Sequence, residues 1–194
     1  MKNLLRFAIL PSALIRLAWC LGALLPLCLQ AVELPTAPIL RIEAGMHTAQ
    51  INRIGTDAAG RIALTCSDDK TARLWALPDG KSPLSDAQTT RPLRTFRIPL
   101  GEGNEGKLYA CALSPDGAVA AMGGWTQAGY EGVGNHNIYL FDTATGRLVR
   151  RLSGLPNVVN DLALSPQGRF LAAVLGAGHG LRVWEVANGR EVGR

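Results

Sequence analysis

The sequence predicts an all-β fold assembled from repeated four-stranded units, and three observations carry this prediction. Short apolar or alternating runs are separated by turn-forming residues, with 22 Gly and 11 Pro among 194 residues. A turn of the Ser-Pro-Asp-Gly type recurs along the chain, and each recurrence is followed by a strand that ends in an aromatic residue. The hydrophobic content of 47% excludes a wholly disordered chain. The abundance of Gly and Pro argues against a bundle of long helices.

The first 31 residues have the pattern of a targeting segment. Lys2 and Arg6 give a positive start, Leu17–Leu29 is an uncharged apolar run of 13 residues, and Ala31 is a small residue at which a signal peptidase could cut. A membrane-spanning helix needs about 20 apolar residues, so an uncleaved anchor is the less favoured alternative. We therefore expect residues 1–31 to be a signal peptide and the protein to be exported, to the periplasm or to the exterior.

The positive charge of the chain is concentrated in this segment. Three of the 20 Lys and Arg residues lie there without any Asp or Glu, so the formal charge of +5 falls to +2 for the remainder. That remainder contains no cluster of basic residues with interleaved aromatics. We therefore expect no nucleic-acid partner, and contact with a membrane only through the N-terminal segment if it is not cleaved.

Three segments align on a shared glycine and define the repeat. They are residues 54–60, 111–117 and 162–168, and each is followed directly by a second apolar run, as in a hairpin. A third strand then ends in an aromatic residue: Ala72–Trp75, Ile138–Phe141 and Leu181–Trp184. A second turn leads to a short fourth strand: Leu93–Ile98, Leu148–Leu152 and Arg190–Val192.

Four short antiparallel strands repeated at roughly 40 to 45 residues are typical of the blades of a β-propeller. We predict blades at about 47–98, 107–152 and 158–194, within a domain that spans 32–194. The distance from the shared glycine to the aromatic residue is 15, 24 and 16 residues in the three units, so the second unit carries an insertion at Gly123–Asn137. Long Gly-rich insertions belong in loops at a propeller rim.

The first unit carries the most specific residues. Gly45-Met-His47 precedes its first strand, Ser67–Thr71 forms its second turn, and Arg73-Leu74-Trp75 ends its third strand. In these residues the chain resembles the WD-repeat β-propeller family. The resemblance implies that His47, either Thr65 or Ser67, Asp69 and Trp75 form that family's buried hydrogen-bonded tetrad. The other units depart from the pattern, since Phe141 replaces the Trp and Gly178 stands at the Asp spacing of the third unit.

The ends of the chain carry a further expectation. Ile39–Glu43 reads as a fourth strand without three strands before it. In this family such an N-terminal strand completes the last blade, and closed propellers have at least about four blades. We therefore expect a partial propeller of about three blades plus an N-terminal closing strand, from the N-terminal part of a longer protein or from a truncated reading frame.

Candidate catalytic groups have simpler interpretations. His47, Ser67 and Asp69 are the residue types of a hydrolase triad, but their spacing matches the tetrad, and no nucleophile elbow accompanies Ser67. Gly101–Gly106 is a literal G-x-G-x-x-G that is followed by a strand rather than a helix, which favours a loop over a dinucleotide site. We predict a protein that is not an enzyme, with no catalytic residue, cofactor or metal.

The candidate partner-binding residues lie in the predicted rim loops. Trp125 and Tyr130 belong to the insertion, where they either anchor a partner or cap their own loop. His136 and His179 lie in Gly- and Asn-rich turns and are expected to be solvated. A ligand shared by the two imidazoles is the weaker alternative, because no carboxylate or thiolate stands at ligand spacing.

Two cysteines, Cys66 and Cys111, lie on neighbouring predicted blades, where a disulfide is possible but not required. The sequence thus predicts a scaffold for protein–protein interaction outside the cytoplasm. The alternative is an N-terminal sensing or docking propeller of a longer multidomain protein, for example one with a caspase-like protease domain.

Overall fold

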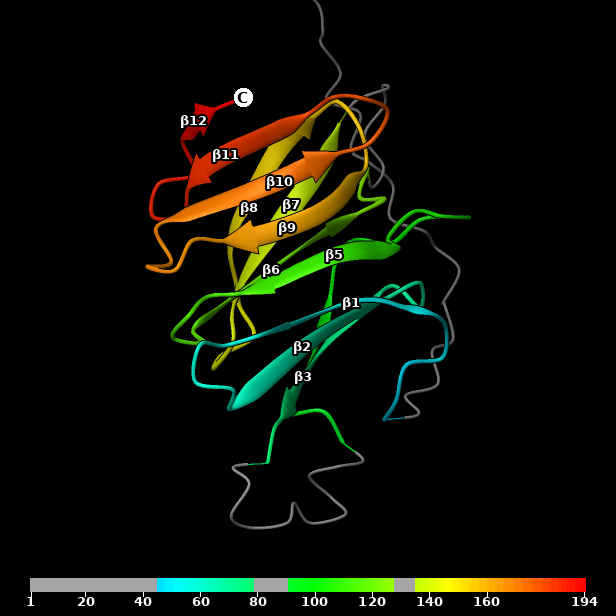
Figure 1. The fold of residues 1–194 in the computed structure, drawn as a ribbon. Helices are drawn as coiled ribbons and strands as arrows, with labels where there is room; N and C mark the ends of the chain where they lie inside the picture. The colour runs from blue at the N-terminus through cyan, green and yellow to red at the C-terminus, as the bar shows by residue number, and fades with distance from the viewer. Residues whose placement is uncertain (1–44, 79–90, 128–134) are drawn as a thin grey trace, which may run out of the picture. The chain divides into compact units, whose positions relative to one another are not determined.

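A computed structural model describes residues 45–78, 91–127 and 135–194, and within these ranges every regular element is a β-strand (Figure 1). The predicted signal peptide, the predicted strand Ile39–Glu43 and Tyr130 lie outside the described residues. The described strands form three four-stranded antiparallel sheets, each with its strands in chain order. The prediction of an all-β chain with three such units is therefore confirmed.

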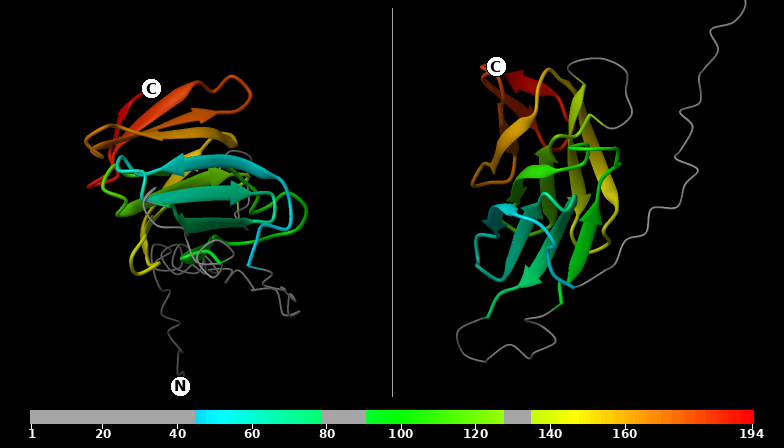
Figure 2. Two further views of the ribbon diagram at one scale, coloured as in Figure 1. Left: turned by 60° about the horizontal axis from the view of Figure 1, so that its bottom comes forward. Right: turned by 90° about the vertical axis from the view of Figure 1, so that its right-hand side faces the viewer.

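Blade 1 contains β1 (Ile51–Thr56), β2 (Ile62–Ser67), β3 (Thr71–Ala76) and β4 (Arg94–Arg97). Blade 2 contains β5 (Leu108–Leu113), β6 (Val119–Gly124), β7 (His136–Asp142) and β8 (Leu148–Leu155). Blade 3 contains β9 (Val159–Leu164), β10 (Phe170–Leu175), β11 (Leu181–Glu185) and β12 (Glu191–Gly193). The first strands β1, β5 and β9 lie side by side, and the colours of Figure 2 follow the blades in chain order.

The strands β7 and β8 are both longer than expected. β7 begins at His136 rather than Ile138, and β8 continues to Leu155 rather than ending at Leu152. The two extensions pair with each other, because His136 lies opposite Leu155. The Gly-rich composition of the insertion suggested a loop here, and the two extra strand ends become apparent only from their pairing with each other.

The shared glycine has the same conformational role in all three blades. Gly60, Gly117 and Gly168 end the first turn with φ of +63°, +77° and +69°, a region that side chains with a Cβ rarely adopt. The residue three positions earlier accepts a hydrogen bond from the amide two positions after the glycine. Asp57 does so from Ile62, Ser114 from Val119 and Ser165 from Phe170. This repeated contact explains why the turn requires Asp or Ser there.

The two faces of each blade have separate packing roles. We call the face toward the preceding blade the leading face and the face toward the next blade the trailing face. The trailing face of blade 1 carries Leu64, Cys66, Ala72 and Leu74, which pack against Cys111, Leu113, Ala120, Met122 and Phe141 on the leading face of blade 2. A second cluster joins blade 2 to blade 3 in the same way, with Ala121, Ile138 and Leu140 against Leu162, Leu171, Ala173 and Trp184. The hydrophobic core therefore lies between blades.

Cys66 and Cys111 meet in the first of these clusters as buried, free thiols. The neighbouring Cys111 side chain and burial both raise the pKa of the Cys66 thiol. The Cys111 thiol points toward the Leu64 carbonyl, with Sγ and O 3.5 Å apart. In the structure the disulfide is therefore not formed, and the two cysteines behave as small apolar core residues.

Within the part of the chain that is described, no helix has the length and apolar character needed to span a membrane.

Candidate functional site

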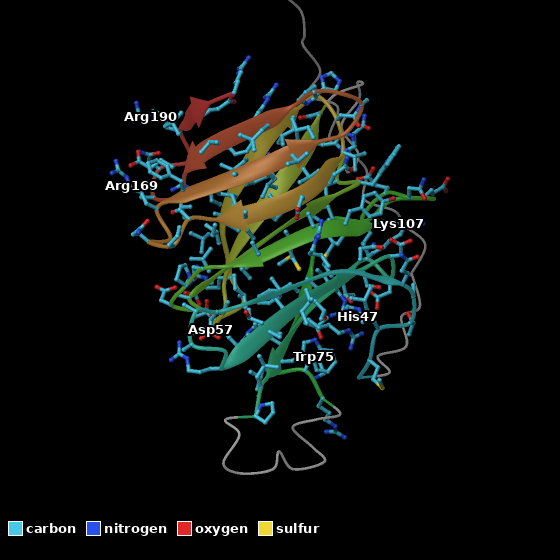
Figure 3. The ribbon with its side chains drawn as sticks, viewed as in Figure 1. His47, Asp57, Trp75, Lys107, Arg169 and Arg190 are labelled. Carbon is cyan, nitrogen blue, oxygen red and sulfur yellow. The ribbon has the colours of Figure 1, made fainter. Side chains whose placement is uncertain are left out.

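The most developed polar site lies in blade 1 and joins four side chains from different segments, of which His47 and Trp75 are labelled in Figure 3. His47 comes from the segment before β1, Thr65 from β2, Asp69 from the β2–β3 turn and Trp75 from β3. Nδ1 of His47 lies 2.8 Å from Oδ2 of Asp69, and Nε2 lies 2.7 Å from Oγ1 of Thr65. Trp75 Nε1 donates to the same hydroxyl at 2.8 Å. The four groups form one continuous network.

The donors and acceptors of this network follow from the chemistry of each group. A carboxylate only accepts, so Nδ1 of His47 carries the proton and donates to Asp69. In the neutral ring Nε2 is then an acceptor, and the Thr65 hydroxyl donates to it while accepting from the Trp75 indole. The side chains of His47 and Asp69 are only 3% and 5% exposed. A buried network of this kind is stabilising only when every member is satisfied.

Asp69 is the ionic end of the network. Burial by itself raises the pKa of its carboxyl group, but hydrogen bonds from His47, from the Thr71 hydroxyl and from the Thr48 amide outweigh burial and lower the pKa well below its ordinary value. The fold therefore favours the charged carboxylate more strongly than the unfolded chain does. The contribution of Asp69 to stability is present above the ordinary carboxyl pKa and is lost as the pH falls toward the lower pKa of the folded state.

We expect the free energy of unfolding to decline as the pH is lowered from about 5 to about 2, and the Asp69→Asn variant to lose less over this range. The variant starts from a lower stability at neutral pH, because the His47 proton then has a weaker acceptor. Urea denaturation at a series of pH values measures both effects. Glu102→Gln, at an exposed loop residue, is the matched control, and it should leave the pH dependence of the free energy of unfolding unchanged. If the free energy of unfolding declined equally at low pH in Asp69→Asn and in the unaltered chain, the role of Asp69 would be contradicted.

Of the two hydroxyls that the sequence left open, the structure places Thr65 in the network. Ser67 lies two residues further along β2, where its Oγ donates to the Ala49 carbonyl and accepts from the Asp69 amide. Thr65, His47 and Asp69 have the order of a nucleophile, base and acid, but the hydroxyl is buried and already accepts from Trp75. A substrate carbonyl would have to displace the indole to reach it, so the arrangement suits a structural role.

The family described as "WD domain, G-beta repeat" matches residues 43–76, which contain the His47 network, and residues 146–185. The chain is also 30% identical over 154 residues to the nuclear distribution protein PAC1-2 of Uncinocarpus reesii. The chain belongs to the WD-repeat family. The match covers 74% of this chain and 30% of that protein, so this chain spans less than a third of the length of that relative.

The second match shows how the WD repeat relates to the blades. Residues 146–185 begin with β8 of blade 2 and end with β11 of blade 3. One sequence repeat is thus displaced by one strand from one sheet, and its parts lie in two adjacent blades. Members of this family are generally non-catalytic scaffolds, in agreement with a site whose polar groups are all engaged with one another.

Two arginines that the sequence analysis missed link each of the first two blades to the next. Arg94 in β4 donates to the carbonyls of Thr143, Ala144 and Thr145 in the β7–β8 turn, with Nε 2.9 Å from the first. Arg150 in β8 donates to the carbonyls of Ala187 and Asn188 in the β11–β12 turn, at 2.8 and 2.9 Å. We call these contacts the arginine clamps. The sequence signal was an Arg at the same place in the fourth strands of units one and two.

A glycine in each receiving turn makes room for the clamp. Gly146 and Gly189 have φ of +75° and +74°. A Cβ on Gly146 would lie 2.7 Å from Nη1 of Arg94, and one on Gly189 would lie 2.7 Å from Cδ of Arg150. The second-turn glycines therefore serve both the backbone conformation and the close approach of the arginine from the preceding blade.

The predicted rim residues divide into exposed and buried groups. Trp125 directly follows β6 and is 37% exposed, whereas Trp184 and Phe141 are 5% and 7% exposed. His179 is exposed in the β10–β11 turn. His136 was expected to be solvated, and that expectation is wrong: it is the first residue of β7 and is buried. Pairing with β8 draws it into the sheet, and burial lowers its pKa so that the ring is neutral near pH 7.

The buried end of the insertion holds Trp125 in place. The Trp125 and His136 rings meet edge to face, with their centroids 5.8 Å apart. Nδ1 of His136 accepts from the Thr126 amide at 3.3 Å, and the Asn137 side chain donates to the Thr126 carbonyl at 2.9 Å. Thr126 and Asn137 are almost completely buried. The partly exposed Trp125 side chain thus packs against His136, which belongs to a set of buried, hydrogen-bonded residues.

Proposed function

We propose that this WD-repeat chain is a non-catalytic scaffold that binds a protein partner outside the cytoplasm, with Trp125 as the principal contact. The observation that carries this proposal is the indole of Trp125, which is exposed while its support is buried. Tryptophan is among the residues most enriched at the energetic centres of protein interfaces, because one large rigid side chain buries much area at little cost in entropy.

The backbone of Trp125 supports this role. Its amide donates to the Lys107 carbonyl at 2.9 Å, and its carbonyl accepts from the Gly106 amide at 2.7 Å. The residue is therefore fixed on both sides to the segment that enters β5. An anchor held this way loses little freedom on binding, which favours affinity.

The proposal that the partner lies outside the cytoplasm rests on the pattern of residues 1–31. The basic start, the apolar run Leu17–Leu29 and Ala31 together support export. The proposal that the chain is not an enzyme rests on the blade 1 network, in which the imidazole, the carboxylate and the hydroxyl are all engaged.

We expect a photo-cross-linking amino acid placed at position 125 of the full chain to capture one protein in intact cells, in the fraction outside the cytoplasm. The recovered partner should then bind the Trp125→Ala variant at least roughly 30-fold more weakly, the loss expected when an anchoring tryptophan is truncated. Leu148→Ala, at an exposed residue on β8, is the matched control and retains affinity.

Two results would contradict the proposal. Equal affinity of the Trp125→Ala variant and the unaltered chain, with both chains folded by thermal denaturation, would remove Trp125 from the interface. Recovery of the cross-linked partner from the cytoplasm alone would overturn the proposed location while leaving the scaffold role intact.

A further inference from the structure

The joint between blades 1 and 2 brings two thiols together. Cys66 belongs to β2 of blade 1 and Cys111 to β5 of blade 2, and both side chains are almost completely buried in the same apolar cluster. The two residues are 45 positions apart in the sequence and belong to different sheets. Their meeting is therefore a product of the way β5 packs against β2.

The contacts of the Cys111 sulfur show where it lies on blade 1. Its Sγ is 3.5 Å from the Leu64 carbonyl oxygen and 3.7 Å from the Arg53 carbonyl oxygen. Arg53 lies opposite Cys66 in the β1–β2 pairing, and Leu64 precedes Cys66 by two residues on the same face of β2. The Cys111 thiol thus lies over the part of blade 1 that carries Cys66, within hydrogen-bonding reach of the Cys66 sulfur.

The reduced pair makes only weak polar contacts. An S–H group is a weak donor and its sulfur a weak acceptor, so the two thiols contribute to the joint mainly as small apolar groups. Loss of their hydrogens would therefore remove little of what holds the joint together. A bond between the two sulfurs would add a covalent link between blades 1 and 2.

We propose that Cys66 and Cys111 are a redox site, at which a disulfide forms between blades 1 and 2 when the chain folds in the presence of an oxidant of the disulfide class. One cysteine thiolate attacks the S–S bond of the oxidant R–S–S–R, forms a mixed disulfide and releases one RSH. The second thiolate attacks the cysteine sulfur of that mixed disulfide and releases the second RSH. Two S–H bonds of the chain are replaced by one S–S bond, and the oxidant is reduced to two thiols.

The bond forms while β5 packs onto β2, before the joint has closed. In the folded chain the neighbouring Cys111 side chain and burial raise the pKa of the Cys66 thiol, so the attacking thiolate is scarce near neutral pH. In the unfolded chain both thiols are accessible and have ordinary pKa values. The redox state in which the chain folds is therefore retained afterwards.

The disulfide stabilises the joint through the unfolded chain. A cross-link between residues this far apart in sequence restricts the unfolded ensemble, and we expect the linked chain to have a Tm about 5–15 °C above that of the reduced chain. The proposal rests on the proposed location outside the cytoplasm only for the supply of oxidant. Exported proteins meet disulfide oxidants, whereas cytoplasmic thiols are kept reduced.

Refolding of the full 194-residue chain from urea, with or without oxidised glutathione, tests the site. Free thiols are blocked by alkylation before digestion with trypsin, which places the four cysteines in three peptides, residues 17–41, 62–70 and 108–147. With the oxidant, mass spectrometry should find peptide 62–70 linked to peptide 108–147 as the dominant linked pair, and reduction should separate them. Without the oxidant, both peptides should be alkylated.

Three variants and one change of order are the controls. Cys66→Ala and Cys111→Ala should each lose the linked pair and have the same Tm with and without oxidant, since alanine is also a small apolar core residue. Trp125→Ala should form the disulfide like the unaltered chain, which separates this site from the partner site. Oxidant added after folding should form the link at least about tenfold more slowly, because each unit of raised pKa removes about nine-tenths of the thiolate.

The proposal is overturned if the chain that refolds with oxidised glutathione is folded but leaves peptides 62–70 and 108–147 unlinked, or if they link equally well to peptide 17–41. A linked chain with a lower Tm than the reduced chain would also overturn it, because the bond would then distort the joint. Recovery of the chain from the cytoplasm alone, with free thiols, would contradict the proposed location. The refolding result would still decide whether Cys66 and Cys111 form the bond.

Discussion

Replacement of Thr65 by Val lowers the free energy of unfolding by about 2–4 kcal/mol. The two side chains have nearly the same shape, so packing in β2 is preserved while the hydroxyl is removed. Nε2 of His47 then loses its donor, and the Trp75 indole loses its acceptor. The His47 side chain is only 3% exposed, and a buried polar group left without a partner costs about 1–3 kcal/mol.

Urea denaturation of the full chain measures this loss, and Thr56→Val is the matched control. Thr56 ends β1 with an exposed side chain, so the same substitution there should change stability by less than about 0.5 kcal/mol. A double-mutant cycle with Trp75→Phe adds a second check. The two substitutions remove the same hydrogen bond. The loss of unfolding free energy in the double variant should therefore be smaller than the sum of the losses in the two single variants. Full additivity, or a Thr65→Val variant as stable as its parent, would contradict the network.

Replacement of Leu171 by Ala in β10 lowers the free energy of unfolding by about 2–5 kcal/mol, the range for a Leu truncated in a core. Leu171 is fully buried in the cluster between blades 2 and 3. That cluster also contains the small residues Ala110, Ala112 and Ala121 of blade 2. Alanine side chains cannot rotate to fill a cavity, so we expect the loss to lie in the upper half of the range.

The matched control for Leu171 is Leu148→Ala, the same substitution at an exposed position of β8, which should cost less than about 0.5 kcal/mol. Chemical denaturation of both variants measures the difference. The result that would contradict the proposed joint is a Leu171→Ala variant that unfolds at the same urea concentration as Leu148→Ala. Such a result would mean that blade 3 contributes little to the stability of blade 2.

Local sequence was sufficient to predict the hairpins, and the resemblance to the WD-repeat family implied the residues of the blade 1 network. The turns before Gly60, Gly117 and Gly168 are short-range features whose residues also make the hydrogen bonds that define them. The choice between Thr65 and Ser67 was not predictable from spacing. Both residues lie on the same face of β2, and only the position of the His47 ring selects the hydroxyl of Thr65.

The features that the sequence did not predict depend on contacts between distant segments. His136 lies in a Gly-rich stretch that suggests a solvated loop, but its pairing with Leu155 buries it. The arginine clamps are likewise invisible locally, because Arg94 binds carbonyl groups about fifty positions further along the chain. Every residue has a backbone carbonyl, so the residue types in the sequence do not show which carbonyl groups an arginine side chain binds.

The direction of the arginine clamps has a consequence for synthesis of the protein. Each clamp joins an arginine in one blade to a turn that is translated later, by 49 to 51 residues for Arg94 and by 37 or 38 for Arg150. At roughly 5–20 residues per second, Arg94 leaves the peptidyl-transferase centre several seconds before its acceptors exist. Blades 1 and 2 therefore each lack the acceptor carbonyls of their clamp until the following blade has been synthesised.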